Sequence, residues 1–300
     1  MTNGIIIINK EAGMTSFGVV ARLRRLFHEK KIGHTGTLDP DALGVLPICL
    51  GKATGVVPLL TEEETKTYEA ILRLGLVTDT QDPSGQVRSE SPVLCTEEEV
   101  REAILSFEGP MDQIPPMYSA LKVKGQKLCD LARQGIEVER KSRRVVFSDL
   151  VIHEISLPEV RFTVTCTKGA YIRTLCHDIG QKLGCGGCMA HLIRTRVGRF
   201  GIEEALTLGQ VEEKLADGAK AEDLLMPADI CFRDLPELTV AGEKQEKAIR
   251  NGNVLKRRET GLPDGQDCRI YDKEGRFAGI YRYKEKEAAF HVVKNFYDLS

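Results

Sequence analysis

The stretch from Gly33 to Gly51, GHTGTLDPDALGVLPICLG, limits what this chain can fold into more than any other. It combines four glycines and two prolines with a largely apolar composition, so we expect neither a helix nor a strand to run through it unbroken. It holds few of the solvating residues of an idle surface loop, which predicts a packed loop. Within it, Asp39 precedes Pro40, and this pair predicts a short helical turn that Asp39 caps and Gly44 ends.

Asp39 is the candidate catalytic residue of this stretch. For an Asp-Pro pair alone, helix capping is the simpler interpretation, and the two roles are compatible. A carboxylate that accepts amide hydrogen bonds at a helix start keeps its charge, which suits a nucleophile or general base. His34 lies in the same stretch between Gly33 and Gly36, where its ring is presented with little steric hindrance. A lone His is usually only a polar residue with its hydrogen bonds satisfied.

The run His-Thr-Gly-Thr-Leu-Asp-Pro around Asp39 resembles the catalytic motif of the bacterial tRNA pseudouridine synthase B family. The resemblance implies isomerisation of uridine 55 in the TΨC arm of transfer RNA, with Asp39 as the nucleophile. His34 is then the candidate to fill the space that the extruded base leaves. Lys10 matches the family's Lys-Pro signature and is a candidate RNA contact, but Glu11 replaces the Pro. Gly55 stands where the family commonly carries Lys.

Further segments carry the same resemblance. Tyr68 matches the family's Tyr that stacks on the target uracil. Tyr171 and Arg173 match a Tyr that packs beside the catalytic Asp and an Arg that pairs with it, so Arg173 would keep Asp39 ionised. Leu192 matches an apolar wall of the uracil site. Without the resemblance, these side chains read as a core aromatic, a solvated Arg and a core Leu.

The pattern of elements predicts an α+β (mixed α/β) fold without regular βαβ alternation. The resemblance implies the pseudouridine synthase fold, with a central, largely antiparallel sheet. Expected helices begin at Ser16, with Phe17, Val20, Leu23 and Phe27 on one face, after Thr96, at about 125–135, after Tyr171, at Leu208 and at about 242–250; expected strands cover 4–9, 67–77, 137–155, 159–167, 268–271, 277–283 and 289–293. A Pro-containing linker divides the chain into a catalytic domain, 1–230, and a β-rich domain resembling the PUA RNA-binding module, 231–300.

Bulk charge does not identify a nucleic-acid binder, because the net charge is only −2. Residues 231–300 carry 14 basic against 12 acidic side chains, and Lys256, Arg257 and Arg258 stand together in them as candidate RNA contacts. A basic cluster is more often a solvated surface, so only convergence in space would make these residues an RNA-binding face.

Neither a signal peptide nor a membrane span is expected, because the longest apolar run near the start is Ile5 to Ile8. The nine cysteines are expected to be reduced thiols of a cytoplasmic protein. Cys185 and Cys188 have zinc-ligand spacing, but the second ligand pair is missing, so we expect no metal. The resemblance implies no cofactor, transfer RNA as partner, a monomer and no required protein partner.

Two alternatives remain open at this point. A non-catalytic RNA-binding protein or chaperone could share the fold, but the intact set of Asp39, Tyr68 and Arg173 argues against it. A carboxylate-dependent glycosylase that releases the base could share the same carboxylate chemistry. Within an isomerase, Asp39 would attack either carbon 1′ of the ribose or carbon 6 of the uracil, and the sequence leaves both open.

Overall fold

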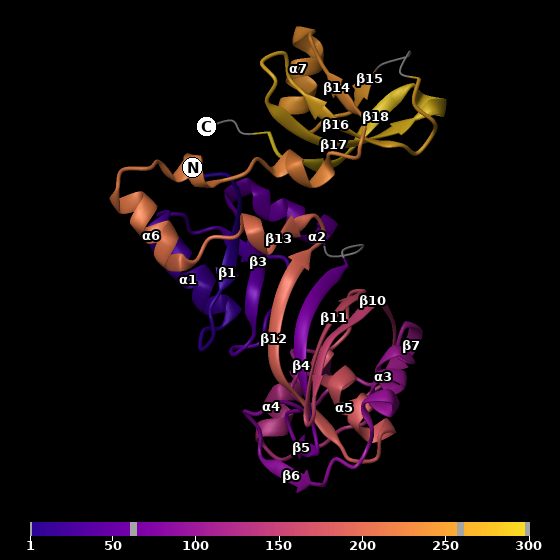
Figure 1. Ribbon diagram of the computed structural model, residues 1–300. Helices are drawn as coiled ribbons and strands as arrows, with labels where there is room; N and C mark the ends of the chain where they lie inside the picture. Colours follow the sequence, from indigo (N-terminus) through magenta and orange to yellow (C-terminus); the bar gives the residue numbers. More distant parts are fainter. Residues whose placement is uncertain (1, 61–64, 257–260, 298–300) are drawn as a thin grey trace.

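The computed structural model describes residues 2–60, 65–256 and 261–297 (Figure 1). Its largest feature is a nine-stranded sheet. Seven strands follow one path in the order β1-β3-β12-β4-β11-β10-β7, while β2 pairs with β3 and β13 pairs with β12. The strands are β1 (Gly4–Lys10), β2 (Ile32–His34), β3 (Leu43–Leu50), β4 (Lys66–Leu74), β7 (Gly109–Gln113), β10 (Arg143–Ser156), β11 (Glu159–Cys166), β12 (Gly187–Val197) and β13 (Phe200–Gly201). Every pair is antiparallel except β12 with β3, which confirms the expected largely antiparallel sheet.

Six of the helices in the described residues lie where the sequence predicts them, and α2 was not predicted. They are α1 (Ser16–Leu26), α2 (Val57–Leu60), α3 (Glu97–Leu105), α4 (Leu128–Arg133), α5 (Ile172–Lys182), α6 (Leu208–Ala216) and α7 (Glu243–Arg250), with a 3-10 helix η1 (Gly51–Val56) before α2. Thr15 is the N-cap of α1, and its hydroxyl accepts from the Gly18 amide at 2.9 Å. Helix α3 has the full capping box of Thr96 and Glu99.

One face of α1 differs from the prediction. Phe17 was expected on the buried face, but its side chain is 66% exposed. Val20, Leu23 and Phe27 are buried as predicted, and Ser16 and Val19 complete the buried face in place of Phe17. The reason is local: Ser16 is drawn inward because its hydroxyl exchanges hydrogen bonds with the backbone of Leu38, 3.1 Å to the carbonyl and 2.9 Å from the amide.

The Gly- and Pro-rich stretch is broken as predicted, because β2 ends at His34 and β3 begins only at Leu43. Its second half nevertheless forms one continuous strand. β3 passes through Gly44 and Pro47 and pairs with β1 from Gly44 to Leu50. Pro47 has no amide hydrogen to donate. Its carbonyl accepts from the Thr35 amide at 3.2 Å, just beyond the last residue of β2. The missing donor therefore falls where the pairing of β2 with β3 ends, and the strand tolerates the proline. Gly44 has φ +101°, and a Cβ there would lie 2.2 Å from the Arg194 carbonyl oxygen. Glycine thus permits the close approach of β3 and β12.

Residues after 236 form a second sheet of five strands, in the order β14-β16-β17-β18-β15. The strands are β14 (Glu237–Thr239), β15 (Leu255–Lys256), β16 (Asp267–Tyr271), β17 (Phe277–Lys284) and β18 (Ala289–Asn295). Figure 1 shows this sheet, with α7, at the end of the molecule next to α2 and far from α3 and α5. The expected β-rich C-terminal part is therefore present. Two short ribbons complete the chain: β5 (Leu76–Thr78) with β6 (Val87–Glu90), and β8 (Lys122–Val123) with β9 (Gln126–Lys127).

Candidate active site

Asp39 lies on the loop between β2 and β3, and Arg194 of β12 fixes this loop from the sheet side. The Arg194 side chain is 1% exposed. Its guanidinium donates to the carbonyls of Val45 at 2.8 Å, Gly36 at 3.1 Å and Thr37 at 3.4 Å. A buried guanidinium is stable only with such partners, and here every carbonyl belongs to the loop or the strand that follows it. Arg194 therefore determines the path of the chain on both sides of Asp39.

Lys10 fixes the same loop from the opposite side. It is 1% exposed, and its ammonium group donates to the carbonyls of Pro40 at 2.7 Å, Met14 at 2.8 Å and Glu11 at 2.9 Å. Desolvation by burial lowers the pKa of Lys10 to about 8, against the opposing effect of nearby carboxylates. The expected contact of Lys10 with RNA is therefore wrong: all three ammonium donors are used inside the protein.

Asp39 itself sits in a turn and does not cap a helix. The Ala42 amide donates to the Asp39 carbonyl at 3.2 Å, which closes a turn over Pro40 and Asp41, and β3 begins at the next residue, Leu43. The predicted helical turn fails because the chain must enter the sheet at once, where β1 and β12 flank it. Among the described residues, hydrogen bonds to the Asp39 carboxylate come from a side chain instead of from amides.

That side chain is Arg173, at the start of α5 and 134 residues further along the chain. Its Nε lies 2.9 Å from Oδ2 of Asp39, and its Nη2 donates to Oδ1 at 3.3 Å. Arg173 is 5% exposed, and it also donates to the carbonyls of Thr80 and Tyr118, each at 3.0 Å, with Oδ2 of Asp82 3.5 Å from its Nη1. The guanidinium plane is thus fixed by two chain segments, 80–82 and Tyr118, and it also contacts the Asp39 carboxylate through two nitrogen atoms.

The charge of Asp39 reflects opposing effects. Desolvation raises the pKa of the carboxyl group most strongly, Arg173 lowers it, and Asp82 raises it again, and the net result is a pKa above the ordinary value of 3.8. Amide hydrogen bonds were expected to favour the charged form of Asp39, whereas burial here opposes that form. The side chain nevertheless remains 40% exposed, so the carboxylate can be reached from outside. A partly desolvated, oriented carboxylate is well suited to nucleophilic attack.

Tyr68 and Leu192 come together on one face of the sheet beside this pair. Tyr68 on β4 pairs in register with Arg194 of β12, and Leu192 pairs with Ala70, so the four side chains lie on the same side. Tyr68 is 8% exposed, and desolvation raises its pKa to about 12 although the Arg194 guanidinium beside its hydroxyl acts in the opposite direction. The negative charge of Asp39 also raises the pKa of the Tyr68 hydroxyl. Leu192 is buried at 7% exposure.

Tyr171 and His34 lie at the edges of the same region. Gln113 holds the Tyr171 backbone at the N-cap of α5, accepting from its amide at 2.8 Å and donating to its carbonyl at 3.1 Å. Desolvation raises the pKa of the Tyr171 hydroxyl, and Asp39 contributes in the same direction. Nδ1 of His34, on β2, is buried without a hydrogen-bond partner among the described residues. Desolvation and the Arg194 cation lower the pKa of His34, which favours a neutral ring.

The remaining predicted residues lie elsewhere. Lys256 is exposed on β15 in the C-terminal sheet, and Arg257 and Arg258 fall outside the described residues. Cys185 and Cys188 are both buried free thiols. In the described parts of the chain, no group of three or more His, Cys, Asp or Glu side chains could hold a metal ion, and no helix is long and apolar enough to cross a membrane.

Three residues of the site were not predicted from sequence. They are Arg194, Asp82 and Gln113, which contact the Asp39 loop, Arg173 and Tyr171 respectively. Arg194 could have been predicted from its spacing, because residues two apart on a strand share a face and Leu192 was expected to be buried.

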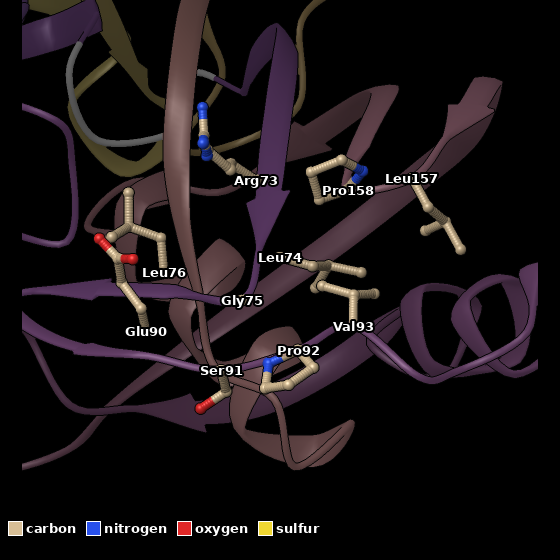
Figure 2. Close-up of a pocket in the computed structure, with 10 residues that line it drawn as sticks. All are labelled: Arg73, Leu74, Gly75, Leu76, Glu90, Ser91, Pro92, Val93, Leu157 and Pro158. Carbon is tan, nitrogen blue, oxygen red and sulfur yellow. The ribbon is translucent and has the colours of Figure 1, made fainter.

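A recess of about 590 Å³ lies away from these residues, where β4 ends (Figure 2). Arg73 and Leu74 line it together with Val93 and the Leu157-Pro158 turn between β10 and β11. None of the predicted site residues lines it, so it offers no support for the catalytic assignment.

Two sequence families match consecutive parts of the chain. The family described as "TruB family pseudouridylate synthase (N terminal domain)" matches residues 24–172, and the "tRNA pseudouridylate synthase B C-terminal domain" matches 173–233. The division falls between Ile172 and Arg173, inside the region expected to be a single catalytic domain. The second match ends before the five-stranded sheet begins.

Curated relatives cover nearly the whole chain. A protein named tRNA pseudouridine synthase B from Lachnoclostridium phytofermentans is 46% identical over 98% of this chain and 99% of its own length. Another protein of that name, from Clostridium acetobutylicum, is 43% identical over 97% and 99%.

Solved structures share the fold. A chain in "Crystal Structure of a Cbf5-Nop10-Gar1 Complex" has a TM-score of 0.73 and 28% identity over 99% of this chain and 85% of that one. A chain in "Structure of H/ACA RNP bound to a substrate RNA containing 2'-deoxyuridine" has a TM-score of 0.71 and 26% identity over 98% and 85%.

Proposed function

The chain belongs to the TruB family of pseudouridylate synthases, and we propose that it isomerises uridine 55 in the TΨC arm of transfer RNA through Asp39. The observation that carries this proposal is the pair of contacts from the buried Arg173 guanidinium to the Asp39 carboxylate, which lies in the Gly- and Pro-rich loop. The substrate follows from the curated relatives, which are named for transfer RNA, and from the motif resemblance.

The reaction needs one nucleophile and no net change of redox state. The bond between nitrogen 1 of uracil and carbon 1′ of ribose breaks, and a bond from carbon 5 to carbon 1′ forms, while carbon 5 loses its proton and nitrogen 1 gains one. Asp39 attacks carbon 1′, which releases the uracil with the electron pair of the glycosidic bond, or it adds to carbon 6 of the ring. In both routes the carboxylate is released when the new carbon–carbon bond is complete, so no cofactor is consumed.

A stacked uridine must leave the RNA arm before Asp39 can reach it, at a cost of a few kcal/mol. We assign Tyr68 and Leu192 to the surface that receives the extruded base, because both lie on the sheet face next to Asp39. We assign Tyr171, at the N-cap of α5, to the same surface, because its hydroxyl is close enough to Asp39 for that carboxylate to raise its pKa. The neutral ring of His34 is the candidate to occupy the vacated position in the RNA, since an uncharged ring stacks without a desolvation penalty for a charge.

The test is to incubate the protein with an unmodified transfer RNA transcript and to identify the product. Pseudouridine at the target supports the proposal, and a transcript that lacks only this uridine is the matched control. Free uracil would assign a glycosylase instead, and an unchanged transcript would assign a non-catalytic RNA-binding protein.

We also propose that the protein works in the cytoplasm as a monomer without an obligatory protein partner. Light scattering during size-exclusion chromatography, with and without transfer RNA, tests the monomer. A dimer at working concentrations, or activity that appears only after a second protein is added, would contradict it.

A further inference from the structure

A second recess, of about 790 Å³, separates the N-terminal part of the chain from the C-terminal sheet. Lys31 and Lys52 line it from the β2 and η1 side, and Arg250 and Lys294 line it from α7 and β18. No acidic side chain lines it among the described residues. Four cations from four chain segments therefore face one space without a carboxylate in its described lining, which makes it a region of positive potential in a chain of net charge −2.

The cations of this recess differ in the interactions that they already make within the protein. The Lys52 ammonium donates to the Tyr297 carbonyl at 2.5 Å and so ties the two walls together. Arg250 lies over the Tyr297 ring, 5.8 Å from its centroid, and 3.9 Å from Glu246. Lys294 is exposed, and its ammonium group makes no hydrogen bond or ion pair within residues 2–60, 65–256 and 261–297. A ligand can therefore bind the Lys294 ammonium group without displacing a hydrogen bond or ion pair within the described residues.

Gly55 makes room for Lys294. A Cβ at residue 55 would lie 2.6 Å from Cε of Lys294 and 3.5 Å from its Nζ. Any side chain at 55 would therefore compete for the place that the end of the Lys294 side chain occupies. The family resemblance implies a Lys at this position, and in this chain the side chain of Lys294, from β18, ends beside residue 55 instead.

We propose that this recess binds the phosphate backbone of the RNA substrate, with Lys294 in place of a Lys at position 55. The inference rests on the proposed function in one respect, that the substrate is an RNA. A run of phosphates fits a recess whose cations come from separate walls, because each wall can neutralise a different phosphate. The contacts are to charge alone, so they add affinity without reading sequence.

The first experiment measures the affinity for an unmodified transfer RNA transcript at several salt concentrations. Lys294→Ala should reduce the slope of log K against log salt by about 0.7 to 0.9, which corresponds to about fivefold weaker binding at 0.15 M salt. Lys286→Ala is the matched control, because Lys286 is also exposed but precedes β18, at the end of the strand away from Lys294. Its slope should equal that of the wild type. An unchanged slope for Lys294→Ala, or an equal change in the control, would overturn the proposal.

The second experiment relocates the charge. Lys294→Ala removes the atoms nearest to a Cβ at residue 55, and the Phe296 ring, with its Cε1 at 3.2 Å from that Cβ, must give way slightly. Gly55→Lys in this background should then restore the wild-type salt slope. Failure to restore it in a folded double variant would mean that Lys294 acts through its own wall only, against the proposed replacement. The outcome is independent of the catalytic assignment. If wild type forms pseudouridine while the slopes do not differ, only the recess is wrong; if no pseudouridine forms while they do differ, only the proposed reaction is wrong.

Discussion

Replacing Arg173 by Met should slow the chemical step far more than it weakens RNA binding. The variant loses two charge-assisted hydrogen bonds to Asp39, at 2.9 and 3.3 Å. Hydrogen bonds to charged groups contribute about 1.5–3 kcal/mol each, and because Asp39 is 40% exposed, we take that range for the pair as a whole. At 1.4 kcal/mol for each factor of ten, the single-turnover rate at saturating transfer RNA should fall roughly 10- to 100-fold.

The same variant should change the pH dependence in a defined direction. The Arg173 cation lowers the pKa of Asp39 against the larger effect of desolvation. Without this cation the pKa rises further, and since the carboxylate is the reactive form, activity should be lost at a higher pH as the solution is acidified. Arg173→Lys is the comparison, because it keeps a positive charge but lacks the two-donor geometry. It should retain most of the pH profile and lose part of the rate.

The assay is single-turnover pseudouridine formation between pH 5 and 8, on variants shown by circular dichroism to be folded. The check on folding matters, because Arg173 also satisfies the carbonyls of Thr80 and Tyr118. An acid limb that does not move in Arg173→Met would refute the electrostatic argument. A variant that loses only affinity, with the wild-type rate at saturation, would make Arg173 a phosphate contact.

The remaining predictions concern the loop that carries Asp39. Asp39→Asn should abolish isomerisation while affinity for transfer RNA stays within a few fold, as measured by filter binding, because the amide keeps the shape but is no anionic nucleophile; turnover by a pure preparation would contradict the assignment. Gly44→Ala should lower the free energy of unfolding by at least about 1–3 kcal/mol in urea titrations, because of its φ and the nearby Arg194 carbonyl. Lys10→Met should destabilise by about 2–5 kcal/mol, because it leaves three carbonyls without their donor; a stability equal to wild type would contradict this.

Much of the local structure could be predicted because it depends on neighbouring residues. The capping box at Thr96 and the apolar positions of β4 are visible in the sequence and are found in the structure. The meeting of Asp39 with Arg173 is of another kind. It joins residues 134 apart, and only the resemblance to a family predicted it.

Buried cations were the main failure of sequence reasoning. Lys10 and Arg194 are each 1% exposed, yet Lys10 was expected to contact RNA and Arg194 was not singled out. Their partners are six main-chain carbonyls, and a carbonyl is present at every residue, so no side-chain pattern marks the acceptors. The same holds for Pro47: whether a proline fits a strand depends on which neighbouring strand ends beside it, which is a property of the sheet.

The two predicted domains, 1–230 and 231–300, share a hydrophobic core. Ile6 and Ile8 of β1 pack into the main core, while Ile5 and Ile7 on the other face join a second core that includes Ile280 of β17. Phe296 belongs to this second core as well, and Val45 of β3 lies in it, a few residues after Asp39.

The C-terminal sheet therefore covers the back of the strands that carry the catalytic loop, which is why β1 reads as an unbroken apolar run instead of an alternating one. Deleting residues 237–300 would expose this second core and disturb Asp39 indirectly. A loss of activity on truncation would then say nothing about RNA contacts. Single substitutions of exposed side chains in the C-terminal sheet, such as Lys294→Ala, leave Ile280 and Phe296 in place, and so they can separate binding from chemistry where a deletion cannot.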